Sequence, residues 1–214
     1  MENLIIRNEE ERDRSEVERI TRDAFWNHNA PGCDEHYLVH IMRTHEDFIP
    51  QLDFVAELDG RIIGNVMYTK ALLIADDGTE KRILSFGPLT VAPEFQRSGV
   101  GKALLERSFE KARSLGYDTV VIFGHPSNYI ARGFKSCKKY NVCVGDGIYP
   151  TALLVKELCD GALLPDKRRR FIESPVCEID RAAAEEFDKL FEPREKEYRA
   201  SQEEFFIYSH STVS

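Results

Sequence analysis

Apolar residues recur with helical and strand-like spacing along most of the chain. Leu4 to Arg7 predicts a first strand, and Arg12 to Phe25 carries apolar side chains at helical spacing. Ser15 or Asp13 is the expected cap of that helix, because a short polar side chain accepts from the free amides of the first turn. Tyr37 to His45 predicts a second helix with one apolar side.

Two turn signals separate the next three apolar runs. Asp59 and Gly60 lie between Phe54 to Leu58 and Ile62 to Leu73, and this dipeptide is typical of a tight hairpin. A second turn, "ADDGTE" at 75–80, leads into Arg82 to Val91. Three consecutive strands in a meander are therefore expected.

A helix and a further strand follow the meander. Ala103 to Leu115 has apolar residues at helical spacing and ends before Gly116, a residue suited to a helix C-terminus. Thr119 to Phe123 is continuously apolar, as in a buried central strand. Because the order strand, helix, strand forms a parallel crossover, the pattern predicts an α/β fold with a mixed sheet.

The pattern weakens toward the C-terminus. "NYIARGF" at 128–134 predicts a short helix stopped by its glycine, and Tyr140 to Val144 with Thr151 to Glu157 predicts a closing pair of strands. Beyond these, one acidic helix is expected at Arg181 to Leu190, and the aromatic segment 204–211 is expected to form a final strand.

Composition narrows the class of protein. The chain has 214 residues, of which 42% are apolar, which suits one large domain or one domain with an appendage. Its net charge of -8, from 29 basic and 37 acidic residues, argues against a nucleic-acid binder, which needs a concentrated basic face. Lys167 to Arg170, "KRRR", sits among acids and is interpreted as a solvated face.

Cysteine usage and the N-terminus favour a cytoplasmic protein with no membrane partner. The first residues are charged, and the longest aliphatic stretch is about five residues, too short for a signal peptide or a membrane span. The five cysteines form no Cys-x-x-Cys pair and lack regularly spaced histidines. We interpret them as reduced and mostly structural.

The glycine-containing stretch at 96–101, "QRSGVG", joins a predicted strand to a predicted helix. Backbone amides at a helix N-terminus bind anions, so the turn is a candidate phosphate site. A P-loop would need glycine in place of Gln96 and serine or threonine in place of Ala103. A dinucleotide fingerprint would need glycine in place of Leu104. Neither known phosphate loop therefore fits.

The pattern that fits is Gln/Arg-x-x-Gly-x-Gly/Ala, with Gln96, Gly99 and Gly101 in the defined places. "LTVAPEFQRSGVGKALL" resembles the strand, turn, glycine loop and helix of the GCN5-related N-acetyltransferase (GNAT) superfamily. Downstream, "NYIARGF" resembles the second segment of the family, with Tyr129, Gly133 and Phe134 in the places of its Tyr-x-x-x-Gly-Phe. The wider string "GPLTVAPEFQ...GHPSNYIARGF" is similar to the YhbS-like subgroup.

The resemblance implies the GNAT acyl-CoA N-acyltransferase fold, a central mixed sheet with splayed parallel strands flanked by helices. It implies acetyl-CoA as the cofactor and a primary amine, of a small molecule or of a protein, as the acceptor. The resemblance covers about Leu4 to Leu158, so we expect an acetyltransferase domain at 1–160 and a C-terminal extension at 161–214. Phe187, Leu190 and Phe191 form one stripe that needs cover, so we expect the extension to pack on the domain as part of a monomer or homodimer.

The same resemblance assigns the cofactor site to the strand end, the glycine turn and the second segment. "Gly87-Pro88" is the expected position of a bulge that turns the amides of Leu89 and Val91 toward the thioester arm. Asn128 is expected to orient pantetheine or the helix entry. The expected cofactor-binding residues are Leu89, Thr90, Val91, Gln96, Arg97, Ser98, Gly99, Val100, Gly101, Lys102 and Asn128.

Tyr129 is the candidate acid, because a phenol can protonate the departing thiolate. The base is poorly defined. Many relatives carry a glutamate on the strand before the glycine turn, where this chain offers only Ser85. Glu57 on the preceding hairpin, His125 after the buried strand, and water are the alternatives.

Trp26 and His28, in the connection after the first helix, are the expected acceptor-binding residues. His36 and His40 are one helical turn apart, a metal-compatible spacing, but they lack a third partner, so no metal site is expected. The missing strand carboxylate leaves one alternative function open, a non-catalytic acyl-CoA-binding regulatory module with the same fold.

Overall fold

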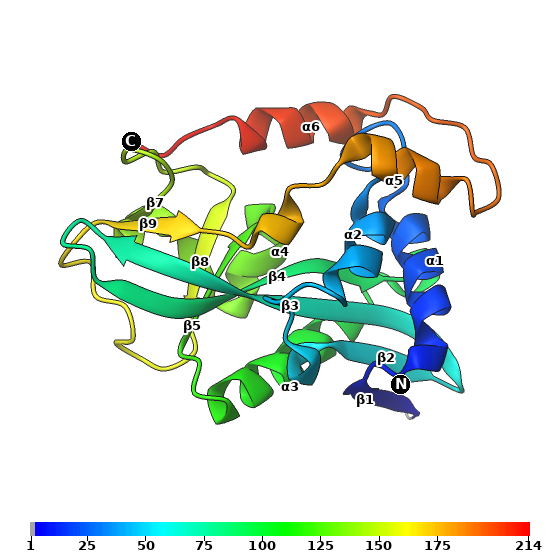
Figure 1. Cartoon of the computed structure of the whole chain (residues 1–214), viewed down its shortest axis with the longest axis horizontal. Coiled ribbons are helices and arrows are strands. Elements are labelled where there is room, and N and C mark those ends of the chain that lie inside the picture. The colour runs from blue at the N-terminus through cyan, green and yellow to red at the C-terminus, as the bar shows by residue number, and fades with distance from the viewer. Residues whose placement is uncertain (1–2) are drawn as a thin grey trace. The chain divides into compact units, whose positions relative to one another are not determined.

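A computed structural model describes residues 3–214 as six α-helices, nine strands and several single 3₁₀ turns (Figure 1). The helices are α1 (Arg14–Phe25), α2 (Glu35–Met42), α3 (Val100–Ser114), α4 (Pro126–Tyr129), α5 (Arg181–Asp188) and α6 (Ala200–Ser209). The strands are β1 (Leu4–Asn8), β2 (Phe54–Leu58), β3 (Arg61–Ala75), β4 (Glu80–Val91), β5 (Thr119–Phe123), β6 (Lys135–Ser136), β7 (Val142–Cys143), β8 (Leu153–Glu157) and β9 (Arg169–Ile172).

The chain divides into two compact units, each assembled from three stretches of sequence. Unit 1 comprises 1–68, 87–108 and 175–202, and unit 2 comprises 69–86, 109–174 and 203–214. Strands β3 and β4 and helices α3 and α6 each contribute residues to both units. The C-terminal extension is likewise shared between the two units.

Unit 1 contains the first part of the predicted meander. Its strand order is β1-β2-β3-β4, and both β1 with β2 and β2 with β3 are antiparallel. Asp59 and Gly60 both have positive φ, as the two-residue hairpin turn between β2 and β3 requires. The core of unit 1 includes Val17 and Ile20 of α1, Val39 and Met42 of α2, and Met67 of β3. The predicted hairpin and both predicted helices are confirmed.

The N-terminal cap of α1 differs in detail from the prediction. Asp13 occupies the cap position, but its side chain makes no capping bond to the helix. Its carboxylate instead accepts from the Glu10 amide at 2.8 Å and from the Arg7 guanidinium. Because the Arg7 guanidinium is charged, it binds the Asp13 carboxylate more strongly than the Glu10 amide does. It holds the pKa of Asp13 below its usual value.

Unit 2 is built around the buried strand β5. The strand pairs parallel with β4 and antiparallel with β8, as expected of a central strand reached by a crossover. Its core includes Leu73, Val121, Val142, Leu153 and Phe171. Gly116 has a φ of +87°, and the Tyr117 amide donates to the Ala112 carbonyl at 3.0 Å, so the predicted C-terminus of α3 is confirmed.

Both strands of the predicted closing pair are present, but their predicted pairing is wrong. Val142 and Cys143 do not pair with the strand predicted at Thr151 to Glu157; β7 pairs with β9, and β8 pairs with β5 and β6 (Figure 1). The "KRRR" run supplies the start of β9, which also pairs with β3. Asp77 and Asp76 pair with Lys167 and Arg168, which precede the strand. Arg169, the first residue of β9, pairs with Asp166 and its side chain is only 11% exposed, so the interpretation of the run as a solvated face is wrong for this residue.

The aromatic segment at 204–211 is helix α6, and the prediction of a final strand is wrong. Its contacts have helical spacing: the rings of Phe205 and Tyr208 are 5.4 Å apart, and those of Phe206 and His210 are 4.2 Å apart. A short apolar run has no periodicity that separates a strand from a helix, so tertiary contacts decide.

Helix α5 of the extension lies beside α1 and α2 in unit 1 (Figure 1). Asp188 accepts from Nε of Arg22 at 2.6 Å, and the Arg22 side chain is 2% exposed. His36 is fully buried, with Nε2 3.1 Å from Asp188 Oδ1, an ion-pair distance without hydrogen-bond geometry. Its ring contacts Phe187 and Phe191. Side chains of α1 and α2 thus contact Phe187 and Phe191. Leu190 is 78% exposed, so only part of the predicted stripe is covered.

We expect the stability of the protein to fall as the pH is lowered from about 6.5 to about 4, in part because of His36. Burial lowers the pKa of His36 to about 4, against the opposing effect of Asp188. The unfolded chain therefore binds a proton at this residue before the folded chain does, and the stabilisation present above pH 6.5 is lost as the pH falls. Its full size is about 3 kcal/mol.

Urea unfolding between pH 7.5 and pH 4.5 measures this effect in the wild type and in His36→Gln, which keeps a neutral polar side chain. The variant is expected to show a shallower loss of unfolding free energy across the range. Equal pH slopes for the two proteins would show that His36 does not carry the effect. His40→Gln is the matched control, because His40 is half-exposed.

Candidate functional site

The turn between β4 and α3 presents backbone amides at the start of a helix. The helical bonds begin with the Ala103 amide, which donates to the Gly99 carbonyl at 3.0 Å, so the amides of Val100, Gly101 and Lys102 precede the first helical bond. Arg97 and Gly99 have φ of +61° and +97°. Such alternation turns successive N–H groups to one side, where they can surround an anion.

The residues before the turn hold it in place. Gln96 donates from Nε2 to the Val91 carbonyl at 3.3 Å, and the Ser98 hydroxyl donates to the Phe95 carbonyl. A β-carbon built on Gly99 meets no atom within 4 Å, so the space beside that backbone is open. The turn is therefore fixed by its own contacts, with open space beside Gly99.

The end of β4 in unit 1 offers backbone groups, rather than free side chains, to the candidate cofactor site. Thr90 is fully buried and its hydroxyl lies 3.0 Å from that of Thr21 on α1. Leu89 and Val91 contact Gly101 of α3, because a β-carbon there would lie 3.7 and 3.6 Å from their side chains. That the backbone amides of this segment bind the thioester arm of the cofactor remains a prediction.

In unit 2, β4 and β5 are paired only at Leu84 and Val120. Beyond that pair, β5 continues to Phe123 without bonding to β4. Parallel strands that separate leave unpaired backbone groups, which an extended ligand can bond as an added strand. The splay expected of the fold is therefore present where β5 leads into α4.

Tyr129 ends the short helix α4, directly after β5. A β-carbon on Gly124 would lie 2.5 Å from the Tyr129 ring, so the glycine permits this ring to pack on the backbone at the end of β5. The ring also contacts Phe86 at 5.8 Å and Phe134 at 5.5 Å between centroids. Burial raises the pKa of Tyr129 to about 12. The phenol is therefore protonated at neutral pH, as an ordinary tyrosine is, and it is a weaker acid than an exposed one.

Asn128 and Ser85 differ in their surroundings. Asn128 is exposed, and its backbone N–H donates to the His125 carbonyl at 3.0 Å within the α4 turn. Ser85 is 3% exposed in the middle of β4. Because Ser85 is buried, it can accept a proton only from a ligand that reaches into the sheet.

Glu57 lies on β2 of unit 1 in contact with Arg7. Its Oε2 accepts from Arg7 Nε at 2.7 Å, and the same guanidinium binds Asp13. The Arg7 guanidinium thus bridges two carboxylates. This arrangement favours a structural role for Glu57 on the strand face.

The predicted acceptor residues Trp26 and His28 contact the C-terminal extension within unit 1. Trp26 Nε1 donates to the Glu195 carbonyl at 3.0 Å, and the His28 carbonyl accepts from the Ser201 hydroxyl at 2.9 Å. Between them, the buried Asn27 accepts from the Glu197 amide at 3.1 Å. The segment after α5 is thus fastened to the connection that follows α1.

Comparison with known proteins decides the family. The Acetyltransferase (GNAT) family matches residues 16–136, which is more than half of the chain. This chain belongs to the GNAT family. The uncharacterized N-acetyltransferase YjhQ of Escherichia coli K12 is 32% identical over 121 residues, or 56% of this GNAT chain. The chain spans 62% of the length of that curated relative.

Solved GNAT structures share the fold. YhbS from Escherichia coli, in complex with CoA, has a TM-score of 0.67 at 21% identity and covers 83% of this chain and 93% of its own. A GNAT acetyltransferase from Brucella melitensis, in complex with acetyl-CoA, has a TM-score of 0.64 at 22% identity and covers 83% and 99%. The predicted GNAT fold is thereby confirmed, and the resemblance to the YhbS-like subgroup stays a prediction.

Several features of this GNAT chain could not be read from its pattern. The position of α6 beside His125 depends on residues far apart in sequence. The packing of Tyr129 on Gly124 joins residues only five positions apart. The signal available for Gly124 was a glycine directly after a continuously apolar strand, where a close approach of another group is common. No comparable signal marked α6.

Metal binding has no support among residues 3–214, where no group of three or more His, Cys, Asp and Glu side chains is placed to hold an ion. His36 faces Asp188, whereas Nδ1 of His40 lies 3.0 Å from Glu18 Oε1. All five cysteines are free, as expected. None of the helices in the described part of the chain is long and apolar enough to cross a bilayer.

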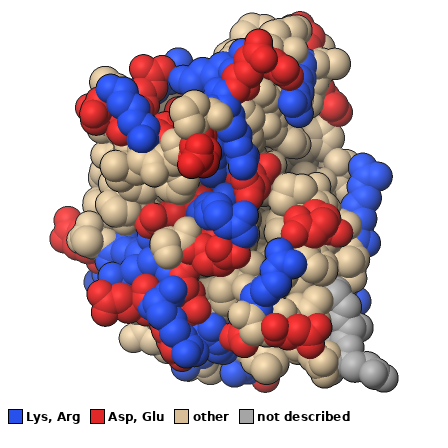
Figure 2. All heavy atoms as spheres, turned by 90° about the vertical axis from the view of Figure 1, so that its right-hand side faces the viewer, with Lys and Arg blue, Asp and Glu red and all other residues tan. Residues whose placement is uncertain are grey.

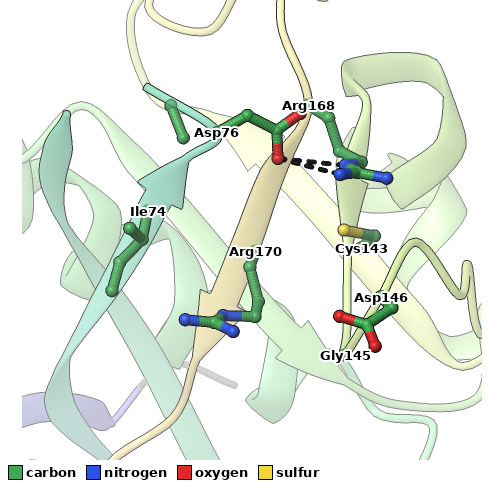
Figure 3. Close-up of a pocket in the computed structure, with 8 residues that line it drawn as sticks. Ile74, Asp76, Cys143, Gly145, Asp146, Arg168 and Arg170 are labelled. Atoms are coloured by element: carbon green, nitrogen blue, oxygen red, sulfur yellow. Dashed lines mark hydrogen bonds and ion pairs between the residues drawn. The ribbon is translucent and has the colours of Figure 1, made fainter. Parts of the chain in front are cut away.

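A pocket of about 210 Å³ lies in unit 2 at the end of β3 (Figure 3). Arg168 bonds Asp76 there, at 3.0 Å from Nη2, and Asp146 lies opposite on the loop after β7 (Figure 3). None of the predicted site residues lines it. On the face shown in Figure 2, basic and acidic side chains are interspersed without a field of one sign.

Proposed function

We propose that this chain transfers the acetyl group of acetyl-CoA to a primary amine. The observation that carries the proposal is the fixed, open turn at 96–102, whose amides precede the first bonds of α3. Acetyl-CoA supplies an anion of matching kind, a pyrophosphate. Membership of the GNAT family and the fold shared with complexes of CoA and acetyl-CoA support the same donor.

In the proposed site, the turn residues Gln96 to Lys102 bind the pyrophosphate, and the amides of Leu89 to Val91 bind the pantetheine arm. Asn128 orients the arm, and Tyr129 donates a proton to the leaving thiolate. The packing of its ring at the end of β5 and the splay of β5 from β4 beside it support this role. Trp26 and His28, now partly covered by the extension, are the proposed acceptor residues.

Residues 1–160 form the proposed acetyltransferase domain, and 161–214 form an extension that contributes to both compact units. The acceptor is a small molecule or a protein amine, and the acidic balance of the chain favours a cationic one. The protein acts in the cytoplasm as a monomer or homodimer.

Release of free thiol from acetyl-CoA, measured over a panel of primary amines, tests the proposal. The panel contains a polyamine, an aminoglycoside, an amino acid and a peptide with a free N-terminus. Calorimetry with acetyl-CoA is run beside it. Turnover on at least one amine supports the enzyme. Tight binding without turnover on any amine would support the acyl-CoA-binding module. The burial of Ser85 and the ion pair of Glu57 favour this alternative, because both were candidate bases.

A further inference from the structure

Helix α6 brings two polar side chains to the turn that follows β5 in unit 2. Glu204 Oε1 lies 3.3 Å from Nε2 of His125. The Tyr208 ring meets the His125 ring edge-on, with centroids 4.5 Å apart. Phe205 packs on Tyr208 and supports this contact. A carboxylate and a phenol from the C-terminal extension therefore lie beside the short helix that carries Tyr129.

The other nitrogen of His125 faces Ser127. Nδ1 accepts from the Ser127 amide at 3.3 Å and lies 2.7 Å from the Ser127 hydroxyl oxygen. A ring nitrogen that accepts from a backbone N–H carries a lone pair, so in the neutral ring the proton is on Nε2, facing Glu204. The Ser127 hydroxyl then donates to Nδ1. Ser127, His125 and Glu204 thus form a chain of hydroxyl, imidazole and carboxylate.

The hydroxyl end of the Ser127–His125–Glu204 arrangement is open to solvent. Ser127 is exposed, and the His125 side chain is 29% exposed. Tyr129 follows Ser127 by two residues, with its ring on Gly124. A capping role for His125 accounts for its bond to the Ser127 amide, but it requires neither Glu204 nor Tyr208. A base oriented by a third group accounts for all of these contacts.

We propose that Ser127, His125 and Glu204 form a proton relay that deprotonates the acceptor amine, with His125 as the base. The inference rests on the acetyl transfer proposed above. Glu204 is a positioning residue, because it acts through His125: its carboxylate fixes the tautomer and stabilises the imidazolium. The extension is then part of the active site.

The relay balances the reaction. The amine nitrogen bonds the acetyl carbon while the carbon–sulfur bond breaks, and the thiolate takes the phenol proton of Tyr129. The amine proton passes to the Ser127 oxygen, whose own proton moves to Nδ1 of His125. Solvent then carries one proton from the imidazolium to the tyrosinate, which restores both groups. The products are the acetylated amine and free CoA.

His125→Asn tests the base without removing the cap, since asparagine is among the best N-cap residues. With acetyl-CoA and the amine of the panel that is turned over fastest, kcat is expected to fall by about 10²-fold, while the affinity for acetyl-CoA changes less than twofold. A kcat within twofold of the wild type would overturn the relay.

Glu204→Gln tests the positioning residue, with Glu178→Gln as the control, because Glu178 is an exposed acid elsewhere in the extension. The titratable and charged groups facing His125 or its immediate partners are Glu204 and Tyr208 of α6, Tyr129 of α4, and Arg132 after it. Loss of the carboxylate disfavours the imidazolium, so the acidic limb of the pH–rate profile should move to lower pH and kcat should fall by about 10-fold. Glu178→Gln should show neither change.

Two results separate this inference from the proposed function. Absence of turnover by the wild type on every amine would overturn the acetyl transfer and the relay together. An active wild type, with Glu204→Gln indistinguishable from Glu178→Gln in kcat and pH profile, would overturn the relay alone. Circular dichroism of each variant checks that α6 remains helical, so that a shifted profile supports positioning rather than unfolding.

Discussion

Gly101→Asp is expected to lower the affinity for acetyl-CoA by about 10²-fold or more while the protein remains folded. The backbone of Gly101 needs no positive φ, and a β-carbon there makes only ordinary contacts with Val91 and Leu89. A carboxylate at a helix N-terminus is itself favourable to the helix. The loss therefore comes from placing a negative charge among the amides that meet the pyrophosphate, each charged bond being worth about 1.5 to 3 kcal/mol.

Isothermal calorimetry with acetyl-CoA measures this loss, and Gly101→Ala is the matched control. The alanine adds the same first carbon without the charge, and the family pattern itself allows alanine at this place. Its affinity should stay within a few-fold of the wild type. Gly99 is a poorer choice, because its φ of +97° would strain any replacement. Unchanged binding by Gly101→Asp would refute the assignment of the turn.

Tyr129→Phe is expected to lower kcat by about 10²-fold or more, the scale of a positioned general acid. The substitution keeps the ring that packs on Gly124, Phe86 and Phe134 and removes only the proton. The affinity for acetyl-CoA should barely change. The loss should shrink with an acyl donor whose thiol leaves more easily, because that leaving group needs less protonation.

Steady-state kinetics over several acyl thioesters measure this effect. Tyr117→Phe is the control, since Tyr117 is a half-buried tyrosine in the connection from α3 to β5. It removes a hydroxyl outside the site and should leave kcat unchanged. A Tyr129→Phe enzyme with near-normal kcat would assign the acid role to water and leave Tyr129 as a packing residue.

The local motifs explain why the proposed cofactor site could be formulated from the sequence. The turn at 96–101 is formed by adjacent residues, and its anion-binding groups are backbone amides, so glycine spacing and the following helix suffice to define it. The same holds for the Asp59–Gly60 hairpin and for Gly116 at the end of α3. In each case one chain segment contains both the signal and the structure that it specifies.

The choice among the candidate bases did not follow from the sequence, for the opposite reason. His125 lies directly after β5, but its significance depends on Glu204, 79 positions further along the chain, at an ion-pair distance of 3.3 Å. Glu57 looked equally suitable in the sequence until Arg7 was found to hold it. A titratable side chain acquires its role from its neighbours, and sequence spacing does not report those neighbours.

The sequence by itself determined the meander, the α3 crossover and the glycine turn, because each follows from short-range periodicity or turn chemistry. Only the tertiary structure decided the partners of β7 and β8, the strand at 169–172, and the helix at 200–209. Short apolar runs satisfy a strand or a helix equally well. Their conformation and pairing are selected by the surface left uncovered by the rest of the chain, which in unit 2 includes the ring of His125 that receives Tyr208.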